Sequence, residues 1–155
     1  MKGTTHLAVG YLAGVVFASH LQQSGTQATI IPIVAATAAL LPDIDKPTSM
    51  LGRRIPLLSI PASLFGHRTL FHAPLLYLLA YLFLAIQFPN HLILITAATI
   101  GIATHLLLDM LNPSGIPLLF PFASKRFHIA NLRSGGFADW LLSIVLMALL
   151  ITTIF

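Results

Sequence analysis

The residues of this chain best placed for chemistry are His105 and Asp109, an imidazole and a carboxylate four positions apart at the end of a long apolar run. In a helix this spacing puts both side chains on one face, in adjacent turns. Two ligands of one metal ion need that arrangement. A polar helix end would show the same pattern without a metal, so the pair alone leaves both interpretations open.

Other histidines and aspartates gather at a few further places and extend the set of candidate metal ligands. The additional candidates are His6, Asp43, Asp45, His67 and His72. Asp43 and Asp45 lie in a segment bracketed by prolines, which disfavour a continuing helix. His67 and His72 are five positions apart and share no helical face, but they converge if His67 precedes the helix. Arg68 and His72, four apart, are expected to share a face.

The composition predicts an integral membrane protein. Of 155 residues, 57% are hydrophobic and only 8% are charged, whereas soluble domains carry roughly 25% charged residues. The length suits one domain, residues 1–155, with about five spanning helices of roughly 20 residues each. The chain has no cysteine, so any metal must be held by His and Asp. Membrane topology explains the net charge of +4, and we expect no nucleic-acid partner.

Apolar runs predict an all-α fold of about five transmembrane helices. They cover residues 7–21, 28–41, 73–88, 92–109 and 140–155. The stretch from Asp43 to Arg68 is rich in proline and charge, and its apolar patch, Ile55 to Phe65, is too broken to span a membrane. We therefore expect one re-entrant or interfacial segment there.

The basic residues indicate how these helices cross the membrane. All eight belong to the N-terminus or to two long loops, residues 43–68 and 112–136, which fall on one side of a five-span bundle. Loops rich in Lys and Arg stay in the cytoplasm, so we expect the N-terminus there as well. All four aspartates and five of the seven histidines share that face. Polar residues pushed to helix ends would occupy both faces equally, so the uneven distribution favours a site.

Some of these residues also have a purely structural explanation. Asp139 starts a helix, where its charge interacts favourably with the helix dipole. His128 is explained as a loop residue, and Asp43 and Asp45 could simply neutralise Lys46. Idle charges at a membrane boundary are costly, however, so we favour the ligand role for the two aspartates.

The chain resembles, over nearly its whole length, the bacterial inner-membrane metal-dependent hydrolases of the YdjM type. The resemblance rests on His6, Pro42 to Asp45, His67 to His72, and His105 to Asp109 with Asn112 and Pro113. That family is considered distantly similar to zinc-dependent phospholipase C, an all-helical phosphodiesterase. The analogy implies a first metal shell of Asp43 or Asp45, His67 or His72, His105 and Asp109. The secreted enzyme's N-terminal tryptophan ligand and later His/Glu ligands have no clear equivalents here, so we expect one or two divalent ions, with Zn²⁺ as first choice.

Such a site would hydrolyse phosphoesters, because a bound divalent ion acidifies water and polarises phosphoryl oxygens. Arg68, ahead of Arg53, Arg54 or Arg133, is expected to hold the phosphate, and Asp45 is the carboxylate expected to orient the water. At the headgroup level the expected substrate is a phospholipid or another lipid-linked phosphate. Two alternatives stay open. The first is an ion or lipid transporter, which would place its ionisable residues near the bilayer midplane. The second is a non-catalytic protein in which the metal only holds the loops together.

Overall fold

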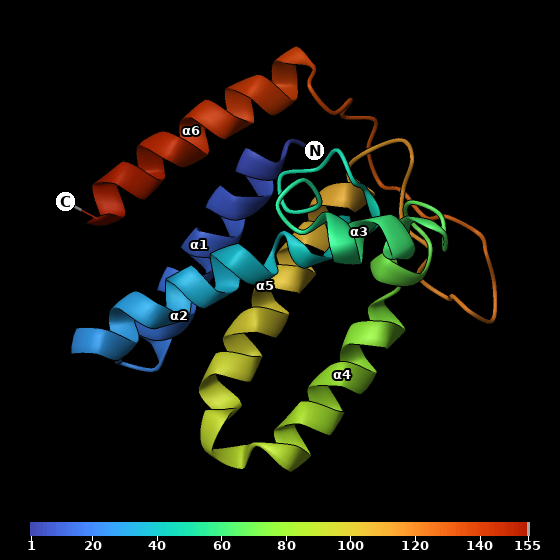
Figure 1. The fold of residues 1–155 in the computed structure, drawn as a ribbon. Helices are drawn as coiled ribbons and strands as arrows, with labels where there is room; N and C mark the ends of the chain where they lie inside the picture. The colour runs from blue at the N-terminus through green and yellow to red at the C-terminus, as the bar shows by residue number, and fades with distance from the viewer. Residues whose placement is uncertain (155) are drawn as a thin grey trace.

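The computed structural model describes residues 1–154, and within them the chain is all-helical (Figure 1). The α-helices are α1 (Gly3–His20), α2 (Gly25–Ala38), α3 (Pro56–Ser63), α4 (Pro74–Gln87), α5 (Leu92–Met110) and α6 (Phe137–Ile154). Short 3-10 helices lie at η1 (Leu41–Asp45), η2 (Leu70–His72) and η3 (Pro89–His91). The predicted all-α class is confirmed, and each long helix coincides with an apolar run to within a few residues.

Helices α1, α2 and α5 form the core, and small residues let their backbones approach closely. A Cβ atom added at Gly101 of α5 would lie 1.9 Å from the carbonyl oxygen of Ala35 in α2. One added at Gly14 of α1 would lie 2.6 Å from the Cα atom of Pro32 in α2. Such close crossings at small residues are typical of helices that pack within membranes. They fix the register of α5 against α2, and with it the position of His105, about one turn beyond Gly101.

The outer helices present apolar side chains on their exposed surfaces. α4 packs against α5 as the second arm of a hairpin joined at η3, and α6 packs against α1 (Figure 1). No residue of α4 is buried, and Phe83 and Ile86 are 61% and 75% exposed. An apolar outer surface of this kind is suited to contact with lipid.

Two helical segments in the described part of the chain are long and apolar enough to cross a membrane. They are Gly25–Asp45, with 21 residues, and Pro89–Met110, with 22. These are fewer than the five spans expected from the sequence. For two of the other three the reason is visible: α1 begins and ends with polar residues, and α4 has only 14 residues.

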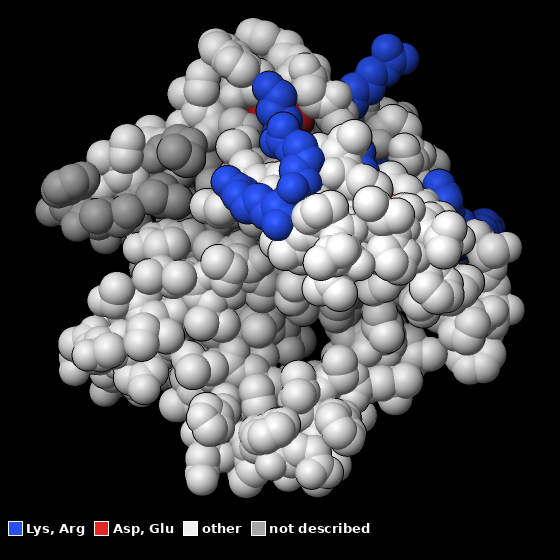
Figure 2. All heavy atoms as spheres, in the orientation of Figure 1, with Lys and Arg blue, Asp and Glu red and all other residues white. Residues whose placement is uncertain are grey.

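Two long loops, residues 42–73 and 111–136, cover the end of the bundle where α1 begins and α5 ends (Figure 1). The second loop is tied to α5 by backbone hydrogen bonds from Ile129 to Met110 (2.8 Å) and from Leu132 to Leu111 (2.9 Å). Figure 2 shows basic side chains gathered over this end of the molecule, while the far end of the α4–α5 hairpin carries none in that view. The loops therefore concentrate the charge of the chain at one end.

The segment from His67 to His72 departs from the helical turn that its spacing indicated. Gly66 and Arg68 have φ angles of +80° and +61°, in the left-handed region that a right-handed helix excludes. α4 starts only at Pro74. Arg68 and His72 therefore do not share a helical face, and that expectation was wrong. His67 does precede the helix, as its convergence with His72 requires.

Candidate metal centre

The structure brings all seven candidate ligands together at the end of the bundle covered by the loops. They form three groups whose possible ligand atoms lie within 4.8 Å of one another: His6, His105 and Asp109; Asp43, His72 and His105; and Asp45, His67 and His72. His105 belongs to the first two groups and His72 to the last two, so the seven residues make one continuous His/Asp cluster.

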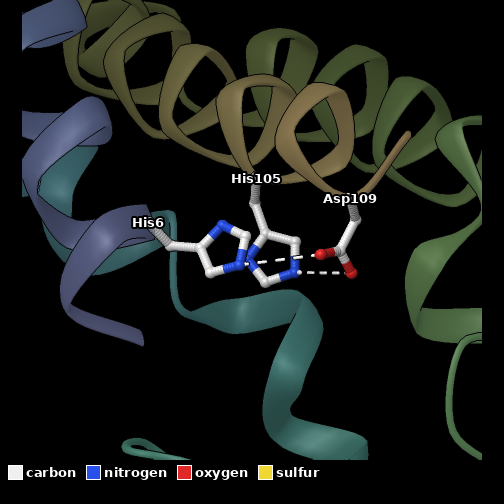
Figure 3. A group of neighbouring side chains, drawn as sticks. All are labelled: His6, His105 and Asp109. Carbon is white, nitrogen blue, oxygen red and sulfur yellow. Dashed lines mark ion pairs between the residues drawn. The ribbon is translucent and has the colours of Figure 1, made fainter. Parts of the chain in front are cut away.

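The first group joins the start of α1 to the end of α5 (Figure 3). The rings of His6 and His105 stack with their centroids 3.8 Å apart. His6 Nε2 lies 3.7 Å from Asp109 Oδ1, and His105 Nε2 lies 3.7 Å from Asp109 Oδ2. As the spacing predicted, His105 and Asp109 point from one face of α5 toward the same point.

The second group adds the proline-bracketed turn and η2. His72 Nε2 lies 3.4 Å from Asp109 Oδ2 and 3.8 Å from Asp43 Oδ1. His105 Nε2 lies 3.9 Å from Asp43 Oδ1. Four side chains from three separate segments thus direct nitrogen and oxygen atoms at a common space.

These distances fit metal ligands better than hydrogen bonds. Separations of 3.4–3.9 Å exceed the N···O range of roughly 2.7–3.2 Å for a hydrogen bond. Two atoms each about 2.0–2.1 Å from one tetrahedral Zn²⁺ are about 3.3–3.4 Å apart. Several of the buried atoms have no hydrogen-bond partner: both ring nitrogens of His6 and His72, Nε2 of His105 and Oδ2 of Asp109. Because unpartnered buried polar atoms are costly, the donor set fits a divalent cation.

The ring of His105 is held in the orientation that metal binding requires. Its Nδ1–H donates to the carbonyl oxygen of Ala39 over 2.7 Å. A carbonyl only accepts, so Nδ1 carries the proton and Nε2 presents its lone pair to the His/Asp cluster. Metal-ligating histidines are commonly oriented in this way by a backbone carbonyl.

The third group is organised by the carboxylate of Asp45. His67 Nδ1–H donates to Asp45 Oδ1 (2.7 Å), and the backbone N–H of Arg68 donates to Asp45 Oδ2 (3.1 Å). His72 Nδ1 lies 3.4 Å from the same Oδ2. The side chain of His67 is 37% exposed, whereas those of His72 and Asp45 are fully buried. The cluster therefore opens toward solvent on the side of His67.

Burial lowers the pKa of His72, but the nearby carboxylates of Asp109 and Asp45 outweigh this effect and raise the pKa above its ordinary value. His72 consequently binds a proton readily when no metal is present. A metal ion must displace that proton before it can bind the ring nitrogen of His72 together with the carboxylates.

Two cationic groups also contact Asp109. Arg68 is 8% exposed, and its Nη2 lies 2.7 Å from Asp109 Oδ2, without the angle of a hydrogen bond. Its Nη1 has no partner. The α-amino group of Met1 donates to Asp109 Oδ1 over 3.1 Å. Sequence reasoning missed this amine, because a backbone group carries no signal in the residue types.

Two other candidates lie outside the His/Asp cluster. Asp139 is fully buried at the first turn of α6. It accepts hydrogen bonds from the Thr5 hydroxyl (2.9 Å) and from the backbone N–H groups of Lys2 (3.2 Å) and Gly135 (2.7 Å). His128 is exposed in the second loop. These hydrogen bonds give Asp139 a structural role without a metal.

Comparison with known proteins places this geometry in a family context. The family model described as "YdjM inner membrane protein" matches residues 1–155. A Bacillus subtilis (strain 168) protein named "Uncharacterized protein YvsG" is 33% identical over 142 residues, which cover 91% of this chain and 86% of that protein. "Inner membrane protein YdjM" of Escherichia coli (strain K12) is 37% identical over 97 residues, 59% of this chain and 49% of that protein. The match to this last relative thus spans about half of its length, and no solved structure matches the chain significantly.

Proposed function

The chain belongs to the YdjM family of inner membrane proteins, and from that premise we propose that it is a membrane-bound metal-dependent hydrolase. Its substrate is a phosphoester of a phospholipid or of another lipid-linked phosphate. One observation carries the proposal: a cluster of buried, unpartnered His and Asp atoms adjoins a buried arginine that also has a free Nη1. Such an arginine is suited to a phosphoryl oxygen, because guanidinium donors match phosphate geometry.

The His/Asp cluster would hold one or two divalent ions, with Zn²⁺ suited to a site of imidazoles and carboxylates. Its seven members are His6, Asp43, Asp45, His67, His72, His105 and Asp109. Bound there, such an ion supplies Lewis-acid polarisation of the phosphoryl group and lowers the pKa of water.

The chain's own residues bind and orient the substrate. Arg68 neutralises charge that develops on the phosphoryl oxygens. Asp45 has both oxygens engaged by His67 and by the backbone of Arg68. It fixes the orientation of those two residues, and each of its oxygens keeps a further lone pair with which Asp45 would orient the water.

An apolar hollow supports a lipid as the substrate. It has a volume of about 330 Å³ and lies between α4 and α5, where Pro74, Leu78, Ile102 and Leu106 are among its walls. Leu106 follows His105 directly, and Pro74 is two positions after His72. An acyl chain in this hollow would begin next to the His/Asp cluster, while the phosphoester remained at the loops.

Placement of the His/Asp cluster at the headgroup level follows from the same proposal. In a five-span arrangement, α1, α2, α4, α5 and α6 cross the membrane with the loops on the cytoplasmic side. α3 would then lie at the interface. Its eight residues reach only about 12 Å, and Leu57 and Leu58 are 88% and 60% exposed.

A purely structural metal is the rival function, and it too has support in the geometry. The ligands come from α1, η1, the His67 turn, η2 and α5, so a metal would tie distant segments together without catalysis. Arg68 separates the two possibilities, because it has no ligand atom for a cation.

The test measures hydrolysis of a short-chain lipid phosphoester and bound metal in the same purified protein. Arg68→Gly, which suits the positive φ of this position, should lower turnover by roughly 10²-fold or more without loss of metal. Arg68→Lys should recover part of the activity, because the charge returns without the planar fork. Arg54→Gln is the matched control: the residue is exposed, and its side chain donates a hydrogen bond to the carbonyl oxygen of Met50.

Two outcomes would overturn the hydrolase assignment. Metal and activity could fall together in Arg68→Gly, which would make Arg68 a structural element of the metal site. Alternatively, metal-loaded wild-type protein could hydrolyse no phosphoester tested.

A further inference from the structure

A polar pocket adjoins the His/Asp cluster between the two long loops. Its volume is about 470 Å³, within the range of roughly 300–1,000 Å³ for small-molecule sites. Its walls include Lys46, His67, Arg68, Asn112, Arg126 and Arg133. Of these, only His67 and Arg68 belong to the site described above. This cavity, termed the basic pocket, therefore lies beside the cluster and not over it.

The basic pocket carries positive charge that the described part of the chain does not neutralise. No carboxylate is among its lining residues. The four aspartates of the chain are already engaged, three in the His/Asp cluster and Asp139 at the start of α6. Within residues 1–154, no carboxylate forms an ion pair with Lys46, Arg126 or Arg133. Their charges are available to an anionic ligand.

Arg68 provides a second indication of a ligand. This side chain is 8% exposed and lines the basic pocket. Its Nη2 faces Asp109, whereas its Nη1 has no hydrogen-bond partner. A buried guanidinium donor without a partner is costly, and an anion in the pocket would satisfy it.

The walls of the basic pocket are fixed by hydrogen bonds between segments. Asn112 Nδ2 donates to Ser134 Oγ over 2.6 Å, beside Arg133. The backbone N–H of Phe127 donates to the carbonyl oxygen of Ile116 over 2.9 Å, beside Arg126. Arg126 also reaches across, with its Nη2 3.5 Å from the carbonyl oxygen of His67. These bonds fix the backbone beside Arg126 and Arg133 before a ligand arrives, which lowers part of the cost of binding.

We propose that the basic pocket binds a second phosphate group, so that the preferred ligand carries a phosphate on its headgroup in addition to the phosphoester at the His/Asp cluster. The inference rests on the proposed function for the place of the first phosphoester. Lys46, Arg126 and Arg133 are not among the candidate metal ligands and line the remaining walls of the pocket, where they would contact a second phosphate of the same ligand. Arg68 lines both subsites, and the two N–H groups of its unpartnered Nη1 would allow one donor to each phosphate.

The experiment is a calorimetric binding measurement on chelator-treated full-length protein in a zwitterionic detergent. The probes are dihexanoyl phosphatidylglycerol, the same lipid with a phosphate on its terminal hydroxyl, and inorganic pyrophosphate. The phosphorylated lipid should bind at least about tenfold more tightly than its parent, as expected for added charge-assisted hydrogen bonds. Arg126→Gln and Arg133→Gln should each remove about tenfold of the affinity for the phosphorylated lipid and leave the parent lipid almost unaffected.

Arg54→Gln and Lys125→Gln are matched controls that remove the same charge outside the basic pocket. Both residues are exposed, and Lys125 lies over the ring of Phe127. Equal affinity for the two lipids, or equal losses in controls and pocket variants, would overturn the proposal. Pyrophosphate that binds as tightly as the phosphorylated lipid would support the phosphate subsite and assign its ligand to a soluble source.

The use of metal-free protein keeps the two proposals separable. A chain that binds the phosphorylated lipid through Arg126 and Arg133, but hydrolyses nothing when metal-loaded, retains the basic pocket and loses the hydrolase function. A chain that hydrolyses both lipids without preference retains the function and loses the pocket.

Discussion

Gly101→Ala tests how the crossing of α5 and α2 positions the His/Asp cluster. The new Cβ would lie 1.9 Å from the carbonyl oxygen of Ala35, whereas ordinary contact begins at 3.4 Å, so the helices must separate locally by about 1.5 Å. His105, about one turn further along α5, donates to the carbonyl oxygen of Ala39 over 2.7 Å. A shift of that size would break this hydrogen bond, because the N···O distance would exceed the limit of roughly 3.2 Å.

The change in the free energy of unfolding of Gly101→Ala follows from two opposing contributions. Alanine favours a helix over glycine by about 1 kcal/mol, whereas overpacking costs about 1–3 kcal/mol. The neighbour at Gly101 is a backbone carbonyl of a packed helix and cannot rotate away, so the upper value applies. We expect a net loss of about 2 kcal/mol in stability. Loss of the bond that orients a ligand should weaken metal affinity by about 10–100-fold.

The assay combines thermal unfolding in detergent with metal affinity from chelator competition. Gly14→Ala is the control, because its Cβ would also clash, at 2.6 Å from Pro32, but at a crossing about two turns beyond His6. It should lower stability and leave metal affinity unchanged. Full metal affinity and unchanged unfolding in Gly101→Ala would refute the reasoning.

Three further predictions address other parts of the chain. The carboxylates of Asp109 and Asp45 raise the pKa of His72, so protons should compete with metal as the pH falls through that pKa. Below it, metal affinity should drop about tenfold per pH unit. Constant metal affinity between about pH 8 and 6 would contradict this. Asp139→Ala removes a fully buried acceptor from Thr5, Lys2 and Gly135. Two of these bonds are only partly buried and the Thr5 hydroxyl keeps Ser143 as a partner (2.6 Å), so the loss should be about 1–3 kcal/mol in total. It should be seen as a lower unfolding temperature, whereas an unchanged temperature would show that these bonds contribute nothing. Single cysteines that replace Ser24 or Asn90 should react with a membrane-impermeant thiol reagent added to intact cells. A cysteine that replaces Ser124 should not react, because loops rich in basic residues stay in the cytoplasm. The reverse pattern would move the His/Asp cluster to the outer face.

The sequence predicted the helices and the members of the His/Asp cluster for related physical reasons. Apolar runs of membrane length must be helical to satisfy their backbone groups, so runs such as 92–109 matched helices closely. Ionisable residues are scarce in such a chain and costly to bury, which singled out His6, Asp43 and Asp109 despite their distance in sequence.

Other features depended on tertiary contacts that no local pattern records. The left-handed φ of Arg68 places it between Asp45 and Asp109, although its spacing from His72 had indicated a helical face. Arg126 had appeared only as a loop charge, because its place beside His67 depends on how the second loop folds over α5. The contact of Gly101 with Ala35 likewise becomes visible only when α5 is packed on α2.

Metal content per chain tests the central claim most directly. Protein purified in detergent without chelators should contain about one or two divalent ions per chain, measured by mass spectrometry of the element. Asp109→Ala and His105→Ala should lose most of the metal, while His91→Ala, at the other end of α5, should keep it. Wild-type protein as free of metal as Asp109→Ala, under conditions that supply Zn²⁺, would contradict the account.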